Sequence, residues 1–115
     1  MQYGLSDYTL ETIRAILGKY PGVQSAILYG SRAKGNFKTG SDIDITLHTD
    51  NSFTHGDLLD VMGDFDDSDM PYMADISIYS SLENQNLKDH IRRVGKVLYE
   101  KQPRKELAAS ADSPR

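Results

Sequence analysis

Residues 42–48 read Asp-Ile-Asp-Ile-Thr-Leu-His, an unbroken alternation of polar and apolar side chains. A period of two is typical of a β-strand that buries one face and leaves the other free. Residues 73–79, Met-Ala-Asp-Ile-Ser-Ile-Tyr, repeat the pattern. The two segments therefore predict two strands of one sheet, with isoleucines and a leucine on the packed face and Asp42, Asp44 and Asp75 on the other.

Apolar spacing predicts the remaining elements. Helices are expected at residues 6–20, 54–65 and 82–94, and further strands at residues 25–29 and 96–100. Capping signals stand at the three helix starts: Ser6, Thr54 with Asp57, and Ser80 with Glu83. Strands interleaved with helices predict an α/β fold, a small mixed β-sheet with helices packed on one face.

The length of 115 residues predicts one domain, which we place at residues 1–101. From residue 102 the chain is polar, small and proline-containing, so residues 102–115 are expected to form a disordered tail. The sequence has no cysteine, which excludes disulfides, thiolate zinc sites and cysteine nucleophiles. No apolar run is long enough to cross a membrane and no signal-peptide pattern follows Met1, so we expect a cytoplasmic protein.

The charge balance bears on the kind of partner. The chain has 13 Lys and Arg against 17 Asp and Glu, a net charge of −4. Proteins that bind nucleic acid in general carry a basic excess on their surface. A nucleic-acid partner is therefore not expected.

The polar face of the predicted sheet carries the most specific chemical signal. Asp42 and Asp44 are two residues apart in a strand, so both carboxylates leave the same face and repel each other. A hard cation relieves that repulsion, and Mg²⁺ favours one or two carboxylates together with substrate phosphates. Asp75, on the corresponding face of another strand, can join them. Three such carboxylates are what a two-metal phosphoryl-transfer site needs.

A glycine-rich loop, residues 30–41, separates two of the predicted strands. Gly30 and Ser31 directly follow a strand, where small residues allow N–H groups and a hydroxyl to approach phosphate oxygens. Arg32 is a candidate phosphate contact, with a structural ion pair that holds the loop as the alternative. Lys34 and Lys38 are expected to be solvated. The loop lacks the Lys-Ser/Thr pair of a P-loop, and G-x-G-x-x-G does not occur.

Gly30-Ser31, ten further residues and then Asp42-Ile43-Asp44 resemble the signature of the nucleotidyltransferase superfamily typified by DNA polymerase β. Over residues 5–100 the length and layout resemble the minimal nucleotidyltransferases, small members usually encoded beside a HEPN-domain partner. The resemblance implies that Asp42 and Asp44 are paired catalytic metal ligands and that Asp75 is the third carboxylate. It also implies that Gly30 and Ser31 contact nucleotide phosphates.

The resemblance further implies an activity. Minimal nucleotidyltransferases act as antitoxins of HEPN-domain ribonuclease toxins, and members adenylylate a tyrosine of the toxin. The expected reaction is transfer of AMP from ATP, with two Mg²⁺ ions, to a hydroxyl of such a toxin in a hetero-oligomer. Two alternatives stay open: an antitoxin that masks the toxin by binding alone, and a nucleotidyltransferase that modifies a small molecule such as an antibiotic.

Other polar residues have simpler interpretations. His48, His55 and His90 lack the spacing of metal ligands and are expected to be surface or hydrogen-bonded histidines. The aspartates between residues 64 and 69 are expected to form a solvated loop.

Overall fold

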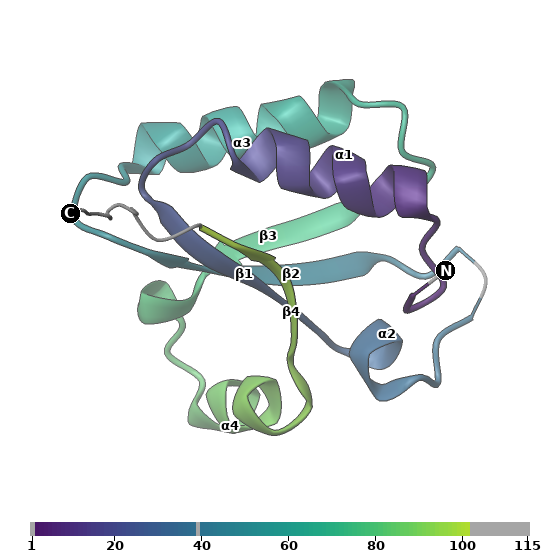
Figure 1. The fold of residues 1–115 in the computed structure, drawn as a ribbon. Coiled ribbons are helices and arrows are strands. Elements are labelled where there is room, and N and C mark those ends of the chain that lie inside the picture. Colours follow the sequence, from purple (N-terminus) through teal and green to yellow (C-terminus); the bar gives the residue numbers. More distant parts are fainter. Residues whose placement is uncertain (1, 39, 102–115) are drawn as a thin grey trace, which may run out of the picture.

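The computed structural model describes residues 2–38 and 40–101, whose strands form one sheet (Figure 1). The strands are β1 (Val23–Tyr29), β2 (Ile43–Thr49), β3 (Ala74–Ile78) and β4 (Lys96–Glu100). Their order across the sheet is β3-β2-β1-β4. Strand β1 pairs antiparallel with both of its neighbours, whereas β2 and β3 are parallel. The predicted mixed sheet of an α/β fold is confirmed.

The helices lie on both sides of this sheet. They are α1 (Asp7–Leu17), α2 (Ser31–Lys34), α3 (His55–Asp67) and α4 (Gln85–Val94), with a 3₁₀ turn, η1 (Tyr79–Ser81), after β3. Helices α1 and α3 cover one face, as predicted, but α4, which was expected on that same face, lies beyond the opposite one (Figure 1). None of the helices in residues 2–38 and 40–101 has the length and apolarity needed to cross a membrane.

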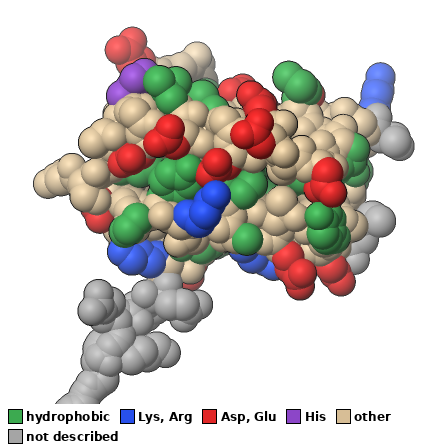
Figure 2. Space-filling view, turned by 90° about the horizontal axis from the view of Figure 1, so that it is seen from above, with side chains coloured by type: hydrophobic (Ala, Val, Ile, Leu, Met, Phe, Trp, Pro, Cys, Tyr) green, Lys and Arg blue, Asp and Glu red, His purple; other side chains and the backbone are tan. Residues whose placement is uncertain are grey.

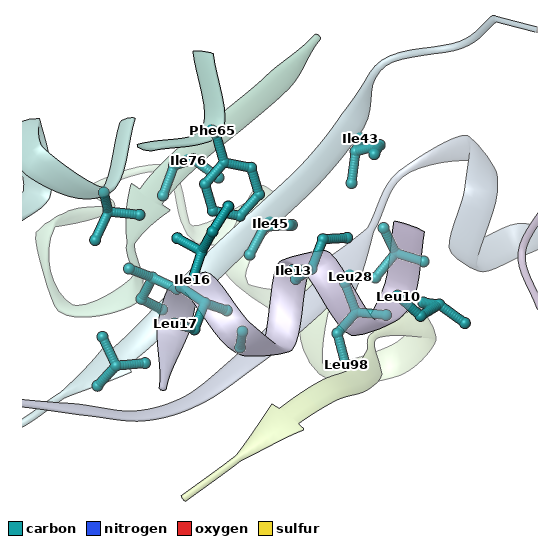
Figure 3. Packing of buried hydrophobic residues seen from close by; sticks show 14 of the residues in the cluster. Leu10, Ile13, Ile16, Leu17, Leu28, Ile43, Ile45, Phe65, Ile76 and Leu98 are labelled. Atoms are coloured by element: carbon teal, nitrogen blue, oxygen red, sulfur yellow. The ribbon is translucent and has the colours of Figure 1, made fainter. Parts of the chain in front are cut away.

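The hydrophobic core lies between the sheet and the pair α1 and α3 (Figure 3). Helices α1 and α3 and all four strands contribute apolar side chains to it. The buried set includes Leu10, Ile13 and Leu17 of α1, Leu28 of β1, Ile43, Ile45 and Leu47 of β2, Phe65 of α3, Ile76 of β3 and Leu98 of β4. Burial of the isoleucines on β2 fixes that strand's orientation, so its polar residues must face away from the core.

The helix starts test the capping signals. The Ser6 side chain accepts the N–H of Thr9, and Thr54 and Asp57 form both hydrogen bonds of a capping box, so these predictions are confirmed. The capping box predicted for Ser80 and Glu83 is wrong. Residues 79–81 form the 3₁₀ turn, and Asn84 caps α4 instead, with its side chain accepting the N–H of Leu87.

Three boundaries also differ from expectation. The first helix ends at Leu17, where Gly18 donates its N–H to the Arg14 carbonyl, rather than continuing to Tyr20. Asp64, Asp66 and Asp67 belong to α3, so most of the predicted acidic loop is helix. The glycine-rich loop contains the single turn α2. The tail expected at residues 102–115 lies outside the described residues.

Candidate active site

Two carboxylates that are far apart in the sequence lie side by side on the sheet. Asp44 of β2 is in register with Asp75 of the parallel strand β3. Paired residues of adjacent strands project from the same face, and adjacent strands are about 4.8 Å apart. The face is the one opposite the core, because the flanking Ile43 and Ile45 are fully buried on the core side. Asp42, two residues before Asp44, lies just outside the strand and is exposed.

The electrostatics of Asp44 reflect this crowding. Its pKa is raised, first by partial burial, then by the charge of Asp75 and then by that of Asp42. The proximity of His90 partly opposes the shift. A carboxylate that is costly to ionise beside two like charges is one that a cation or another positive group would stabilise. The three predicted acids therefore form one electrostatic unit with Asp44 at its centre.

These acids fit a magnesium ion that is shared with a substrate. Within residues 2–38 and 40–101, no three His, Asp or Glu side chains are already arranged as a closed metal-binding group. Mg²⁺ does not require one, since it usually takes one or two carboxylates and completes its shell with water and substrate phosphates. Asp42 and Asp44 with Asp75 supply hard oxygen donors of that kind. The assignment of these residues as metal ligands remains a prediction.

Gly30 brings the chain directly against Asp44. Its backbone has φ 78° and ψ −155°, a conformation that is essentially restricted to glycine. A β-carbon on Gly30 would also overlap Oδ2 of Asp44. The sequence predicted that a small residue here permits a close approach. In the structure the group that lies against Gly30 is the Asp44 carboxylate, and the approach to a phosphate stays a prediction.

Ser31 follows as the first residue of α2 and is partly exposed. The helix lasts one turn and ends at Gly35, which has a left-handed conformation with φ 88°. Because β1 runs antiparallel to β2 and Tyr29 is in register with Asp44, the chain enters α2 beside the carboxylates. Gly30, which the sequence pairs with Asp44, therefore lies beside it in space. Their contact with a nucleotide remains a prediction.

The surroundings of the Arg32 side chain do not suit a contact with phosphate. Its side chain is buried, with 2% exposure. Nε and Nη2 donate to the Ser41 carbonyl at 3.1 and 2.7 Å, and Nη1 donates to the Tyr3 carbonyl at 2.9 Å. The guanidinium also lies 5.0 Å from the ring of Phe37 and 4.6 Å from that of Tyr72.

These contacts correct the expectation for Arg32. They favour the alternative function, holding the loop, although the partners are carbonyl oxygens and aromatic rings rather than a carboxylate. The buried guanidinium ties residues near the N-terminus to Ser41, immediately before Asp42. Lys34 and Lys38 are exposed, as expected.

His90 of α4 is the functional candidate that the sequence reasoning missed. Its Nε2 accepts the backbone N–H of Gly30 at 3.2 Å. Its ring also lies edge-on to that of Tyr29, with centroids 6.3 Å apart and planes at 82°. The pKa of Tyr29 is raised, chiefly by burial and further by Asp75 and Asp44, although Ser77 opposes the shift. His90 and Tyr29 therefore belong to the surroundings of the carboxylates.

One signal for His90 was present in the sequence. It lies three residues after Leu87 and four before Val94, on the stripe that α4 turns toward the sheet. The other two histidines differ. His48 lies on the same sheet face, farther along β2, and packs on Tyr79 with centroids 4.8 Å apart. His55 is exposed at the start of α3.

Comparison with known sequences gives one match that spans most of the chain. The family model described as polymerase beta, nucleotidyltransferase, matches residues 11–104. Those residues include every strand and all the candidate site residues. No curated protein sequence matches the chain.

Solved structures share the fold. A toxin–antitoxin complex with AMP-PNP matches at a TM-score of 0.65 and 22% identity, over 81% of this chain and 74% of that one. The toxin–antitoxin MntA-HepT matches at a TM-score of 0.53 and 20% identity, over 84% of this chain and 74% of that one. A chain from Sulfolobus solfataricus, described as a nucleotidyltransferase, matches at a TM-score of 0.52 and 17% identity, over 80% of this chain and 77% of that one. At these identities the likeness shows the fold.

Proposed function

The chain belongs to the polymerase beta nucleotidyltransferase family, and on that premise we propose that it transfers AMP from ATP to a hydroxyl group of a protein toxin. The observation that carries the proposal is the position of Gly30 against Asp44, in register with Asp75. This arrangement places the Gly30-Ser31 turn beside carboxylates on the sheet face opposite the core. It has the components that phosphoryl transfer requires, which are positioning and charge neutralisation.

The reaction assigns separate tasks to the chain's residues. The acceptor oxygen forms a bond to the α-phosphorus of ATP, the bond from that phosphorus to the bridging oxygen breaks, and pyrophosphate leaves. Ser31 donates its hydroxyl to a phosphate oxygen, and Asp42 and Asp44 lie on the triphosphate side. Asp75 is exposed on the edge strand β3, so we assign it to the acceptor side, where it takes the proton that the hydroxyl loses.

Asp42, Asp44 and Asp75 would hold Mg²⁺, which when bound neutralises the triphosphate charge and makes the acceptor hydroxyl more acidic. Without a cation, the charges of Asp75 and Asp42 already raise the pKa of Asp44. Binding of the triphosphate is therefore expected to require divalent metal. No side chain of the site needs to form a covalent intermediate.

A toxin partner is proposed from two kinds of support. The structural neighbours include toxin–antitoxin complexes, one of them with the ATP analogue AMP-PNP. The surface over α1 and α3 is rich in acidic side chains (Figure 2), and α3 carries five aspartates without a lysine or arginine. This acidic face lies on the other side of the sheet from Asp44 and Asp75, so it suits attachment of a partner with a basic, RNA-binding surface and does not itself receive the acceptor hydroxyl. We therefore propose a cytoplasmic complex with a HEPN-domain ribonuclease, modified on a tyrosine.

The proposal is tested by incubating the protein with Mg²⁺, labelled ATP and the purified HEPN partner. We expect label on the partner, an intact mass increased by one or more adenylyl groups, and ribonuclease inhibition that persists after the two proteins are separated. The control is Asp42→Ala with Asp44→Ala, which should leave the partner unmodified. A partner of unchanged mass that regains ribonuclease activity after separation would instead support masking by binding.

A further inference from the structure

Gly30 is held by a side chain from another element. Its backbone N–H donates to Nε2 of His90, on α4, at 3.2 Å. An imidazole nitrogen accepts a hydrogen bond through its lone pair, so this contact uses the ring nitrogen that faces the Gly30 N–H. The ring is oriented by its edge-on contact with Tyr29, the residue before Gly30. One histidine thus contacts two successive residues where β1 enters α2.

This bond meets a need of the local backbone. Gly30 has a conformation outside the ordinary helix and strand regions, and no side chain caps the start of α2. A partly buried N–H there requires an acceptor, and His90 supplies one. Since Asp44 lies against the same glycine, the orientation of the Gly30 peptide sets where Ser31 stands relative to the Asp44 carboxylate.

We infer that His90 is a positioning residue for nucleotide binding: by accepting the Gly30 N–H, it holds the Gly30-Ser31 turn so that Ser31 and Asp44 face the same ligand. The inference rests on the proposed function, because it takes that ligand to be the triphosphate. It also revises one expectation from the sequence. With the Gly30 N–H directed at His90, the phosphate contact falls to Ser31.

The attachment of α4 does not depend on His90. Ile91 is buried, with 3% exposure, and at the helix end a β-carbon on Gly95 would lie 2.6 Å from the Ile27 side chain of β1. These contacts hold α4 against the sheet at the residue after His90 and again at the end of the helix. Removing the imidazole should therefore alter the Gly30 turn more than it alters the stability of the fold.

The test compares His90→Leu with His90→Gln, whose amide oxygen can replace the accepting nitrogen. We measure the affinity for AMP-PNP with Mg²⁺ by calorimetry, turnover with ATP, and the exchange protection of the Gly30 amide by NMR. His90→Leu should lose the protection and weaken nucleotide binding about 10-fold, as expected for one lost hydrogen bond. His90→Gln should recover most of both, and the melting temperatures of the two variants should agree.

His55→Leu, the same change at an exposed histidine on α3, is the matched control and should bind like the unaltered protein. Equal nucleotide affinity in His90→Leu and the unaltered protein would overturn the inference and leave the proposed function standing. Equal losses in His90→Leu and His90→Gln would overturn it too. An unaltered protein that binds no nucleotide would overturn the proposed function itself, and the inference with it.

Discussion

Gly30 and Asp44 are in such close contact that a single added methyl group on the glycine would overlap the carboxylate. Asp44 belongs to β2 and Gly30 directly follows β1, so the antiparallel pairing of β1 with β2 brings them together. Glycine is therefore required at position 30 for two reasons, the backbone conformation there and the space that the Asp44 carboxylate occupies.

Gly30→Ala should damage both stability and activity. The positive φ that alanine would have to adopt costs about 1–3 kcal/mol, and the β-carbon must displace Asp44. Gly63→Ala is the matched control, because nothing lies within 4 Å of its β-carbon position in α3. That control should stabilise the helix by about 0.5–1 kcal/mol. Denaturant unfolding and transfer assays check both, and an active Gly30→Ala protein would contradict the site geometry.

Asp44→Asn should stabilise the metal-free protein. It should also slow AMP transfer by at least about 100-fold. The folded-state pKa of Asp44 is raised, so its contribution to stability is fully present below the unfolded value of 3.8 and is lost as pH rises through the folded value. At neutral pH the charged carboxylate is therefore a cost that asparagine removes.

The measurement is thermal unfolding of both proteins from pH 3 to pH 7, without and with Mg²⁺. The advantage of the Asn variant should vanish at the acid end, and Mg²⁺ should stabilise the unaltered protein alone. A variant that is less stable than the unaltered protein at pH 7 without metal would show that Asp44 is not electrostatically strained.

Asp75→Asn should reduce turnover by about 100-fold or more while nucleotide affinity stays nearly unchanged, because we assign Asp75 to the attacking hydroxyl. Single-turnover rates and calorimetric binding of AMP-PNP separate the two effects. A large loss of affinity with an unchanged rate would move Asp75 to the triphosphate side.

Arg32→Ala should destabilise the fold by about 3 kcal/mol, because it removes three hydrogen bonds and two ring contacts from a buried position. Arg32→Lys should not restore the loss, since an ammonium cannot reproduce the planar fork. Lys34→Ala, at an exposed position of the same short helix, should change stability little. Urea unfolding measures these changes in stability. An Arg32→Ala protein that is stable but binds ATP poorly would instead support a contact between Arg32 and a phosphate.

Tyr20→Phe should cost about 1 kcal/mol at pH 8, where the Tyr20 hydroxyl donates to Asp64 at 2.5 Å. Burial and Asp64 raise the pKa of Tyr20 from 10.0 to about 12. This stabilisation is complete below pH 10 and is lost as pH rises toward 12, so the difference between the proteins should shrink over that window. Tyr8→Phe, which loses a hydrogen bond at a 61% exposed side chain, is the milder control.

The carboxylates were predictable because the period of a strand places alternate residues on one face without further information. The register between β2 and β3 was not, since it depends on how α3 packs over the sheet. Arg32 was misjudged for a related reason. In the sequence it is a cation in a glycine-rich loop, and two of the residues that enclose it, Tyr3 and Tyr72, are distant in the sequence.

The contact of His90 with Gly30 could not be predicted from the sequence either. Sixty residues separate it from Gly30, so no local spacing connects the two. Its place on the inward stripe of α4 indicated burial but not a partner. The partner follows from the position of α4 on the face opposite the core, which one-sided packing did not anticipate.

The parallel pairing of β2 with β3 has a consequence for how the protein matures. Parallel neighbours need a crossover, so Asp44 and Asp75 can meet only after α3 has formed and docked. The antiparallel contact of β1 with β2 spans a shorter stretch of chain and closes a smaller loop. We expect the Gly30–Asp44 half of the site to assemble early in folding and the Asp75 half to join it late.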